Sequence, residues 1–384
     1  MKVALFHDFL VRMGGAELVL MVFAEMFPDA PIYTTCCDFT VLERRYPGLS
    51  SRIRVVPAAQ IRFSFLKSLP LIGNMATKIM IRNFPRYIDH VDLSGYDMVI
   101  LNSTAWSHGV ITPTEAKVVT YMHAPMRFVW DWYSEYKQSF NVGNHQKILN
   151  VILTMMLSKA RIWDQVASKR ESLLLCNSKT TQKRIKKYHR KEAQVLFPPV
   201  EIEHIPTPKS NTPIHDNYFL VISTLAQYKR VDLAVDLFTK LGRKLIIIGD
   251  GPELQKLKHR AGPSIIFTGF VSQEEKLRYL ERCRALIFPT EDDFGMVPIE
   301  AMAAGKPVLA YQKGGALEYI IPGKTGNFFL EQTAESMERG LAELLDQEEH
   351  FQPRELRSFA EQFSKTTFLR KFREILKKEL NVEI

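Results

Sequence analysis

The stretch Phe288-Pro-Thr-Glu-Asp-Asp-Phe-Gly-Met-Val-Pro-Ile-Glu-Ala-Met-Ala-Ala-Gly-Lys-Pro307 decides the fold of the second half of the chain. It opens at the end of an apolar run, 285–288, which is typical of a buried strand. Gly295 then interrupts the chain, and Pro298 stands where the first turn of a helix accepts proline. The alanine-rich residues that follow predict a helix. A strand, a loop and a helix in this order are the repeating unit of an α/β fold.

The start of this predicted helix also predicts a type of ligand. The first N–H groups of a helix lack partners within it, and the helix dipole adds positive charge, so a phosphate is suited to this place. Two acids frame it, Asp292 in the loop and Glu300 in the first turn. Carboxylates repel a phosphate, and we therefore expect them to accept hydrogen bonds from hydroxyl groups. A nucleotide sugar carries both phosphates and hydroxyls.

Size and composition indicate a globular protein of two domains. The chain has 384 residues, which exceeds one ordinary core, and 46% of them are hydrophobic. A formal charge of +9 is compatible with nucleic acid, anionic lipid or a phosphorylated substrate as partner. The cysteines show no metal-ligand spacing, and we expect reduced, buried thiols at Cys36, Cys37, Cys176 and Cys283.

No signal peptide or membrane-spanning helix is expected. The apolar run after Lys2 ends at His7, which is too short for a signal sequence. The best candidate for a membrane span, 148–157, falls well short of the roughly 20 residues that are needed. We therefore expect a cytoplasmic protein.

Apolar runs that predict strands alternate with helical patterns along the whole chain. The predicted strands are 2–6, 30–34, 97–102, 117–122, 173–177, 194–197, 218–223, 244–248, 264–267, 285–288 and 307–311. Such alternation predicts doubly wound parallel sheets with helices on both faces. Ligands bind beyond the carboxyl ends of the strands in such sheets.

Three prolines, Pro206, Pro208 and Pro213, stand among polar residues and predict a linker at 206–217. We therefore expect an N-terminal domain over 1–205 and a C-terminal domain over 218–365. A helix over 366–384 is expected to pack back on the first domain. With two such domains, the natural place for a site is the cleft between them.

In the first half, three motifs are candidates for ligand contacts. Gly14-Gly15 follows the first strand, where a glycine pair lets the backbone approach a phosphate or sugar, although a simple turn is the alternative. His123 ends a strand and is well placed to face the cleft, and a structural, hydrogen-bonded histidine is the alternative. Arg127 and Trp130 follow it and could line an acceptor pocket, with packing as the alternative for the tryptophan.

In the second half, Lys229-Arg230 follows a strand, and two cations there suit a pyrophosphate. Gly249 lies in a turn that could border a nucleoside. Gly269 lies in a run that could hold a base through its backbone. A plain turn and a buried strand end are the respective alternatives. The pair Gly314-Gly315 could approach a sugar-phosphate.

Two stretches, 62–87 and 147–170, combine basic and apolar residues. Such a surface can lie on an anionic bilayer, and core-facing helices with solvated Lys and Arg are the alternative. Nucleic acid is not expected as a partner, because no known motif is present and the apolar residues are mostly aliphatic rather than stacking aromatics.

Together, these motifs resemble glycosyltransferase family 4 over nearly the whole chain. The run from Asp292 to Glu300 is similar to the Glu-x7-Glu signature of that family. Further similar motifs are Gly14-Gly-Ala-Glu17, Tyr121-Met-His-Ala-Pro-Met-Arg127, Asn177-Ser178, Pro198-Pro-Val200, Tyr228-Lys-Arg-Val-Asp232 and Gly249-Asp-Gly-Pro252. The branch that the chain resembles most holds bacterial O-antigen and exopolysaccharide mannosyltransferases.

The resemblance implies a GT-B fold, with two Rossmann-like domains facing a central cleft. It implies a retaining transfer of a hexose, mannose from GDP-mannose, to a glycan or polyprenyl-linked acceptor in cell-surface polysaccharide synthesis. It also implies that no metal or other cofactor is needed. The lipid-linked acceptor and the two basic, apolar stretches lead us to expect a protein that is peripheral on the inner face of the plasma membrane. It implies nothing about the oligomeric state.

The resemblance further implies roles for single residues. Lys229, His123 and Asp292 are the expected catalytic residues, with Asp292 on the sugar hydroxyls. Glu300 is expected to accept hydrogen bonds from the ribose. The expected donor-binding set is completed by Gly15, Arg230, Gly249, Gly269, Phe294, Gly295, Met296 and Val297. The expected acceptor contacts are Gly14, Arg127 and Trp130.

Two positions depart from the family pattern. Asp292 stands where the signature usually has Glu, and Thr224 stands where many members have Arg. These departures leave two other interpretations open, a nucleotide-sugar epimerase of the same fold and a non-catalytic nucleotide-binding homologue.

Overall fold

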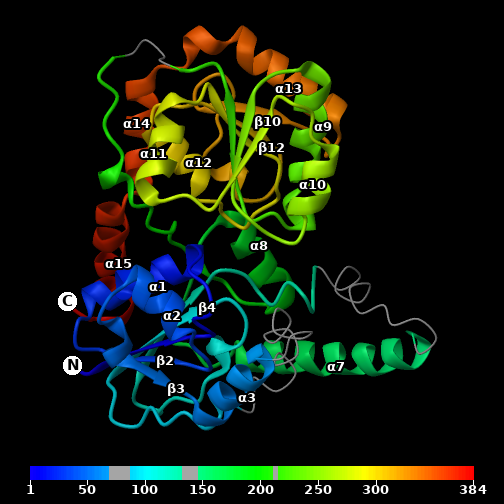
Figure 1. Ribbon diagram of the computed structural model, residues 1–384. Coiled ribbons are helices and arrows are strands. Elements are labelled where there is room, and N and C mark those ends of the chain that lie inside the picture. Colours follow the sequence, from blue (N-terminus) through cyan, green and yellow to red (C-terminus); the bar gives the residue numbers. More distant parts are fainter. Residues whose placement is uncertain (69–86, 132–145, 211–214) are drawn as a thin grey trace. The chain divides into compact units, whose positions relative to one another are not determined.

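The computed structural model describes residues 1–68, 87–131, 146–210 and 215–384 (Figure 1). The chain forms two compact units. The first consists of Met1–Leu196 and Phe372–Ile384, and the second of Phe197–Lys371. Each unit contains a parallel sheet with helices around it, which confirms the fold class predicted from the alternation of strands and helices.

The sheet of unit 1 has seven strands in the order β3-β2-β1-β4-β5-β6-β7. The strands are β1 Val3–His7, β2 Ile32–Thr34, β3 Ile53–Val55, β4 Met98–Ser103, β5 Lys117–Met122, β6 Leu173–Cys176 and β7 Gln194–Val195. All neighbours pair in parallel. The order reverses between β1 and β4, and a doubly wound sheet binds ligands at such a switch point.

The described helices of unit 1 are α1 Gly15–Met26, α2 Phe39–Arg45, α3 Pro57–Ser68, α7 Gln146–Ala167, α8 Lys179–Tyr188 and the C-terminal part of α15 Lys365–Leu380. α15 packs against α1, since the rings of Phe372 and Phe23 lie 5.0 Å apart. Lys117 Nζ also donates a hydrogen bond to Leu380 O at 2.7 Å. The last residues of the chain therefore belong to the first unit.

The sheet of unit 2 has six strands in the order β10-β9-β8-β11-β12-β13. The strands are β8 Phe219–Ile222, β9 Leu245–Ile248, β10 Ile265–Gly269, β11 Ala285–Phe288, β12 Val308–Tyr311 and β13 Gly326–Phe329. All neighbours are parallel, and the order reverses between β8 and β11. The carboxyl ends of β8 and β11 therefore flank the switch point of this sheet.

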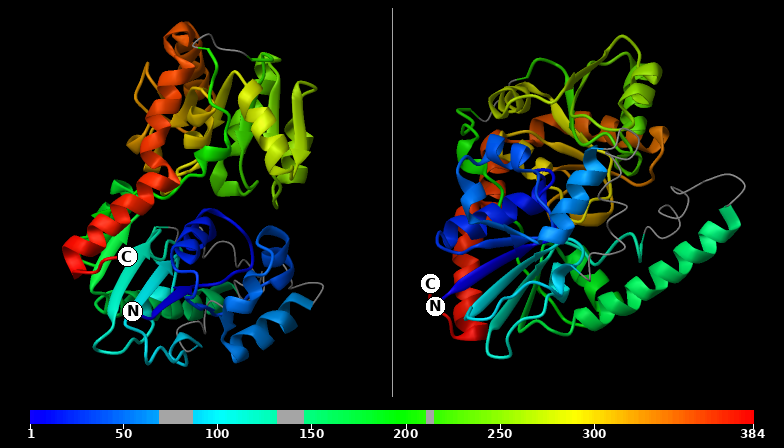
Figure 2. Two further views of the ribbon diagram at one scale, coloured as in Figure 1. Left: turned by 90° about the vertical axis from the view of Figure 1, so that its left-hand side faces the viewer. Right: turned by 60° about the horizontal axis from the view of Figure 1, so that its bottom comes forward.

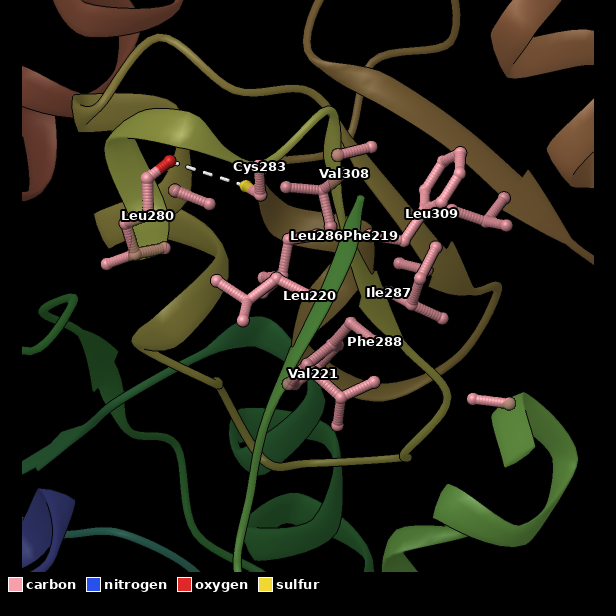
Figure 3. Packing of buried hydrophobic residues seen from close by; sticks show 14 of the residues in the cluster. Phe219, Leu220, Val221, Leu280, Cys283, Leu286, Ile287, Phe288, Val308 and Leu309 are labelled. Atoms are coloured by element: carbon pink, nitrogen blue, oxygen red, sulfur yellow. Dashed lines mark hydrogen bonds between the residues drawn. The ribbon is translucent and has the colours of Figure 1, made fainter. Parts of the chain in front are cut away.

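The helices of unit 2 are α9 Val231–Leu241, α10 Leu254–Arg260, α11 Gln273–Arg282, α12 Val297–Ala303, α13 Ala334–Asp346, α14 Pro353–Ala360 and the start of α15. Figure 3 shows the core that they cover, where side chains of β8, β11 and β12 such as Leu220, Ile287 and Val308 pack together. The Cys283 thiol at the edge of this core donates to Leu280 O at 3.3 Å. These strands are buried on both faces, which is why they read as unbroken apolar runs.

Within the described residues, short 3-10 helices occur at seven places, η1 Leu49–Arg52, η4 Ser107–Gly109, η6 Ile202–His204, η7 Gln227–Lys229, η8 Gly314–Glu318, η9 Glu348–His350 and η10 Glu361–Phe363.

The boundaries of the units differ from the expected domains. Residues 197–205, expected at the end of the first domain, belong to unit 2. Val200 N donates to Phe363 O at 2.9 Å, and Ile202 and Ile205 are buried in the core of unit 2. Pro206 and Pro208 therefore lie in chain of unit 2 without regular secondary structure rather than at the point where contacts change, and Pro213 lies outside the described residues. At the other end the boundary falls inside α15, at Phe372, and not at residue 366 as expected. A continuous helix carries no sequence signal that could have predicted this boundary.

The four cysteines are free and buried, as predicted. Burial raises the pKa of the Cys36, Cys37 and Cys283 thiols to about 12. None of the helices in the described parts of the chain combines the length and the apolarity that crossing a membrane requires. Most of the first basic, apolar stretch, 62–87, lies outside the described residues, because residues 69–86 are not described.

Candidate active site

The switch point of unit 2 brings Lys229 and Asp292 into direct contact. Lys229 ends η7, after β8, and Asp292 lies in the loop after β11. The Lys229 ammonium lies 2.6 Å and 2.7 Å from the two carboxylate oxygens of Asp292. The side chains are 16% and 21% exposed, so solvent screens the pair only in part. Thr290 Oγ1 also donates to Asp292 Oδ1, at 3.3 Å.

A second pair of the same kind joins Glu300 to Lys276. Lys276 Nζ lies 2.8 Å from each carboxylate oxygen of Glu300. Lys276 belongs to the first turn of α11, which follows β10 and packs on α12. The sequence analysis missed Lys276. The only sequence signal near Lys276 was the capping box of Ser272 and Glu275, which predicts where α11 begins. No spacing rule connects the start of that helix to Glu300.

The loop that carries Asp292 is held by close backbone packing. Gly295 has φ +83°, and a Cβ on it would lie 2.6 Å from Phe288 Cζ. A Cβ on Gly315 would lie 2.2 Å from the backbone of Phe294, and Gly315 N donates to Asp292 O at 2.8 Å. The pair Gly314-Gly315 therefore packs against the backbone of the loop that carries Asp292. Tyr319 OH fixes it further by donating to Phe294 O at 2.8 Å.

The predicted helix after this loop is α12. It begins at Val297 with Met296 as N-cap, and Pro298 lies in its first turn, as the sequence predicted. The helix is short, with seven residues, and its first turn also presents Glu300. The backbone N–H groups that such a start leaves without intrahelical partners are those of Met296 and Val297, because Pro298 has no N–H and Ile299 N donates to Met296 O at 2.9 Å.

Gly249, just after β9, and Gly269, the last residue of β10, differ from each other in their surroundings. Gly249 has φ +137°, and a Cβ there would lie 1.9 Å from Ser223 O, so the turn after β9 packs directly on the end of β8. Gly269 has φ +72° with no neighbouring atom within 4 Å of its Cβ position. Gly249 is thus required by packing, whereas Gly269 has open space beside it.

Arg230 is placed differently from its neighbour Lys229. It has φ +51°, an unusual value for a residue other than glycine, and its guanidinium pairs with Asp232 at 3.1 Å. It also lines a pocket of ≈ 270 Å³ together with Lys256 and other residues of α9 and α10. The Arg230 guanidinium therefore pairs with Asp232, whereas the Lys229 ammonium pairs with Asp292.

In unit 1, the switch point carries a hydrogen-bonded network around His123. Asn102, in β4, donates from Nδ2 to Ala16 O at 2.9 Å, so its Oδ1 must be the acceptor for His123 Nε2 at 2.8 Å. His123 therefore carries its proton on Nε2. Burial, and then the nearby His7, lower the pKa of His123 to about 3, so the ring is neutral at neutral pH.

The same network reaches the predicted glycine pair. His7 Nδ1 donates to Asn102 O at 2.8 Å, and its Nε2 lies 3.6 Å from Glu17 Oε1. Burial disfavours the charged forms of both His7 and Glu17. The hydrogen bond and the attraction between these two side chains nevertheless raise the pKa of His7 and lower that of Glu17. Gly14 N donates to Glu17 Oε2 at 2.8 Å, and Gly15 begins α1. The structure thus links His123 to the Gly14-Gly15 turn.

Asp8 is a further buried residue that the sequence analysis did not single out. Its Oδ2 accepts from Thr104 N at 2.6 Å and Ala105 N at 3.0 Å, and its Oδ1 accepts from Trp106 N at 2.5 Å and Ser107 N at 2.7 Å. This carboxylate therefore holds the chain just after Asn102. The contacts span more than 90 positions, which no local motif could reveal.

For the expected acceptor residues, the structure favours packing at one position. The Trp130 ring stacks on Tyr188 at 4.6 Å, and its Nε1 donates to Asp164 Oδ2 at 2.7 Å. These contacts fit the packing role that the sequence left open as the alternative for Trp130. Arg127 is partly buried in the same loop.

Residues 205–363 match the family model of glycosyl transferases group 1. The chain is 25% identical to the α-1,3/1,6-mannosyltransferase ALG2 of Dictyostelium discoideum over 64% of this chain and 67% of that protein. It is 24% identical to the O-antigen chain mannosyltransferase C of Escherichia coli over 35% of this chain and 39% of that protein.

Solved structures resemble the whole chain in fold. HepE of Anabaena, solved in complex with UDP, has a TM-score of 0.69 at 18% identity, covering 98% of this chain and 100% of that chain. Sucrose-phosphate synthase from Thermosynechococcus elongatus has a TM-score of 0.66 at 14% identity, covering 99% and 100%.

Residues 205–363 form a glycosyltransferase group 1 domain, and the two parallel-sheet units together have the GT-B fold. The chain is a glycosyltransferase, and the predicted resemblance to glycosyltransferase family 4 is confirmed.

Proposed function

We propose that this glycosyltransferase transfers mannose from GDP-mannose, with retention of configuration, to a lipid-linked or oligosaccharide acceptor in the synthesis of a cell-surface polysaccharide. The observation that carries the proposal is the set of two lysine–carboxylate pairs, Lys229–Asp292 and Lys276–Glu300, at the carboxyl ends of the strands of unit 2. Two of the curated relatives are mannosyltransferases, which supports mannose as the sugar.

The two pairs supply the charge pattern that a nucleotide sugar requires. In the proposed complex the Lys229 ammonium contacts the pyrophosphate and Asp292 accepts hydrogen bonds from the sugar hydroxyls. Glu300 accepts hydrogen bonds from the ribose, and Lys276 orients its carboxylate. Each acid is already paired with a cation, so a negatively charged ligand is not repelled by a bare carboxylate.

The proposed reaction breaks the bond between the anomeric carbon and the phosphate oxygen and forms a bond to the acceptor oxygen on the same face. The acceptor proton passes to the departing phosphate. Lys229 and the backbone N–H groups around Gly295 and Met296 stabilise the growing negative charge on the leaving group, with Arg230 as a further cation. We propose that no bound metal or other cofactor takes part.

In unit 1 we propose that neutral His123 takes part in the transfer and that the Gly14-Gly15 turn and Arg127 contribute to acceptor binding. His123 holds its proton on Nε2 toward Asn102, which leaves the Nδ1 lone pair as a hydrogen-bond acceptor. A neutral imidazole suits contact with an uncharged sugar, because it requires no counter-ion.

The test is a transfer assay with the full chain and a panel of GDP-mannose, UDP-glucose and ADP-glucose. We expect turnover with GDP-mannose in the presence of a metal chelator, and an α-linked product by NMR. Lys229→Met and Glu300→Ala should lose activity while remaining folded. Turnover with UDP-glucose alone would overturn the donor, a rearranged nucleotide sugar without acceptor would indicate an epimerase, and full activity in both variants would overturn the site.

A further inference from the structure

The outer face of α7 exposes a stripe of apolar side chains. Val151, Met155, Ile162 and Val166 are 60%, 59%, 66% and 54% exposed. Steps of four, seven and four residues place all of them on one side of a helix. Figure 2 shows α7 projecting from the sheet of unit 1. An exposed apolar stripe on a helix of a folded domain indicates a surface that another body covers.

The opposite face of α7 is occupied by the core of unit 1. Leu157 and Ala167 are buried, and the buried Asp164 carboxylate lies 3.1 Å from His108 Nε2 and 2.7 Å from His189 Nε2. These contacts fix the rotation of the helix. The apolar stripe therefore cannot turn inward without separating the Asp164 carboxylate from both histidines.

The charges on and beside this stripe are positive. Between positions 146 and 170 the only acid is Asp164, which is buried, whereas the basic residues are Lys147, Lys159, Arg161, Lys169 and Arg170. Lys159 is exposed on the same side as Met155 and Ile162, and Lys169 and Arg170 are exposed just after the helix. The exposed surface of this segment thus combines apolar side chains with cations and carries no carboxylate.

Helix α3 repeats the pattern on the same unit. Ile61 and Phe65, four residues apart, are 71% and 63% exposed. Its sequence, Pro57–Ser68, contains Arg62 and Lys67 and no acid, and Lys67 is ion-paired with Asp38 outside the helix. The inner side chains of α3, such as Phe63, and those of α7, such as Leu157, are buried in one common core. Both helices therefore turn apolar and basic residues outward from that core.

We propose that the outer faces of α7 and α3 form a docking surface for an anionic lipid bilayer, on which α7 lies in the interface without crossing it. The charge is complementary to anionic headgroups, and the apolar stripe between the cations can enter the boundary of the acyl chains. The cations on the outer face would select a lipid surface over a neutral one. This surface is separate from the donor site of unit 2, so the proposal does not depend on the sugar or on the reaction.

The experiment is flotation of the full chain with vesicles of phosphatidylcholine alone or mixed with phosphatidylglycerol. We expect binding to the mixed vesicles and at least about tenfold weaker binding to the neutral ones, with loss of binding at high salt. Ile162→Glu and Met155→Glu should each weaken binding about tenfold or more, since each removes an apolar contact and adds repulsion. Lys159→Glu should weaken it while leaving the apolar stripe intact.

Leu330→Glu is the matched control, because Leu330 is also exposed, at 66%, but lies in unit 2. It should bind vesicles like the unchanged protein. Circular dichroism and thermal unfolding verify that the variants remain folded. Equal binding of all variants, equal binding to neutral vesicles, or no binding would overturn the proposal. A concentration-dependent dimer that Ile162→Glu dissociates would also overturn it, by showing that a second copy covers the stripe.

Discussion

The Lys229 ammonium lies 2.6 Å and 2.7 Å from the carboxylate oxygens of Asp292, a residue 63 positions further along the chain. The two side chains come from loops after β8 and β11, the strands that flank the switch point of unit 2. Both are mostly buried, so the pair keeps two opposite charges together at the place where a phosphate and a hydroxyl are proposed to bind.

Lys229→Met should lower kcat by at least about 100-fold, because it removes a cation that stabilises the leaving phosphate. It should also cost about 1–3 kcal/mol of stability, since the Asp292 carboxylate loses its partner. The double variant Lys229→Met with Asp292→Asn should regain much of that stability and stay inactive. Steady-state kinetics and urea unfolding provide the measurements. Recovery of activity in the double variant would contradict the proposed role of Lys229.

Glu300→Ala should weaken the binding of GDP by about 10- to 100-fold, because a charged acceptor for the ribose hydroxyls is lost. Lys276→Met should have a smaller effect, since the carboxylate remains but loses the contacts that orient it. Calorimetric titration measures both. A nucleotide without the ribose 2′- and 3′-hydroxyls is the control, and it should bind the unchanged protein and Glu300→Ala equally. If this control nucleotide bound the unchanged protein much more tightly than Glu300→Ala, the result would show that Glu300 does not act through the ribose hydroxyls.

Asn102→Asp should change the pH dependence of kcat/KM. In the unchanged protein His123 has a pKa of about 3 and contributes no ionisation near neutral pH. A carboxylate at position 102, in contact with His123 Nε2, should raise that pKa and add an acidic limb to the pH–rate profile. Asn102→Leu should lower activity without adding such a limb. Identical profiles for all three proteins would show that His123 does not act in the rate-determining step.

The buried Asp164 network should make the stability of unit 1 depend on pH in two directions. Burial opposes the charge on His108, yet Asp164 raises the pKa of His108, so this contribution is complete below about pH 6.5 and is lost as the pH rises through the raised value. Burial likewise opposes the charge on Asp164, but its two histidine partners lower its pKa. Its contribution is present above about pH 4 and is lost on acidification.

The contribution of this network to stability should therefore be greatest between about pH 4 and pH 6.5. Asp164→Asn should cost about 3–5 kcal/mol and flatten the loss of stability at higher pH, because it leaves two buried histidines without their carboxylate. The tryptophans of the chain all lie in unit 1, so urea unfolding followed by their fluorescence reports on this unit. If Asp164→Asn kept the same pH dependence of stability as the unchanged protein, that pH dependence would arise from groups other than the Asp164 network.

Gly315→Ala should destabilise unit 2 by about 1–3 kcal/mol and lower the transfer rate, because the new Cβ would meet the backbone of Phe294 and displace the loop that carries Asp292. Gly242→Ala is the comparison. It has φ +63° and open space around its Cβ position, so only a backbone cost of about 1 kcal/mol is expected, with activity retained. Thermal unfolding and the transfer assay separate the two effects.

Much of the fold could be predicted because buried parallel strands are continuous apolar runs, as in β9, Leu245–Ile248. Two strands were missed. β3, Ile53–Val55, is short and contains Arg54, and β13, Gly326–Phe329, begins with Gly and Asn. Each is the outermost strand of its sheet, where one edge lacks a neighbour and a strong apolar signal is not required.

The sequence by itself determined the alternation of strands and helices, the start of α12 and the residue types around it, because these depend on local propensity and on chain order. Only the tertiary structure decided which charges meet. Lys276 reaches Glu300 between two packed helices, and Asn102 sets the proton position on His123 between two paired strands. It also placed residues 197–205 in unit 2. Contacts between residues far apart in the chain leave no pattern in the sequence, since they depend on which strands become neighbours in the sheet.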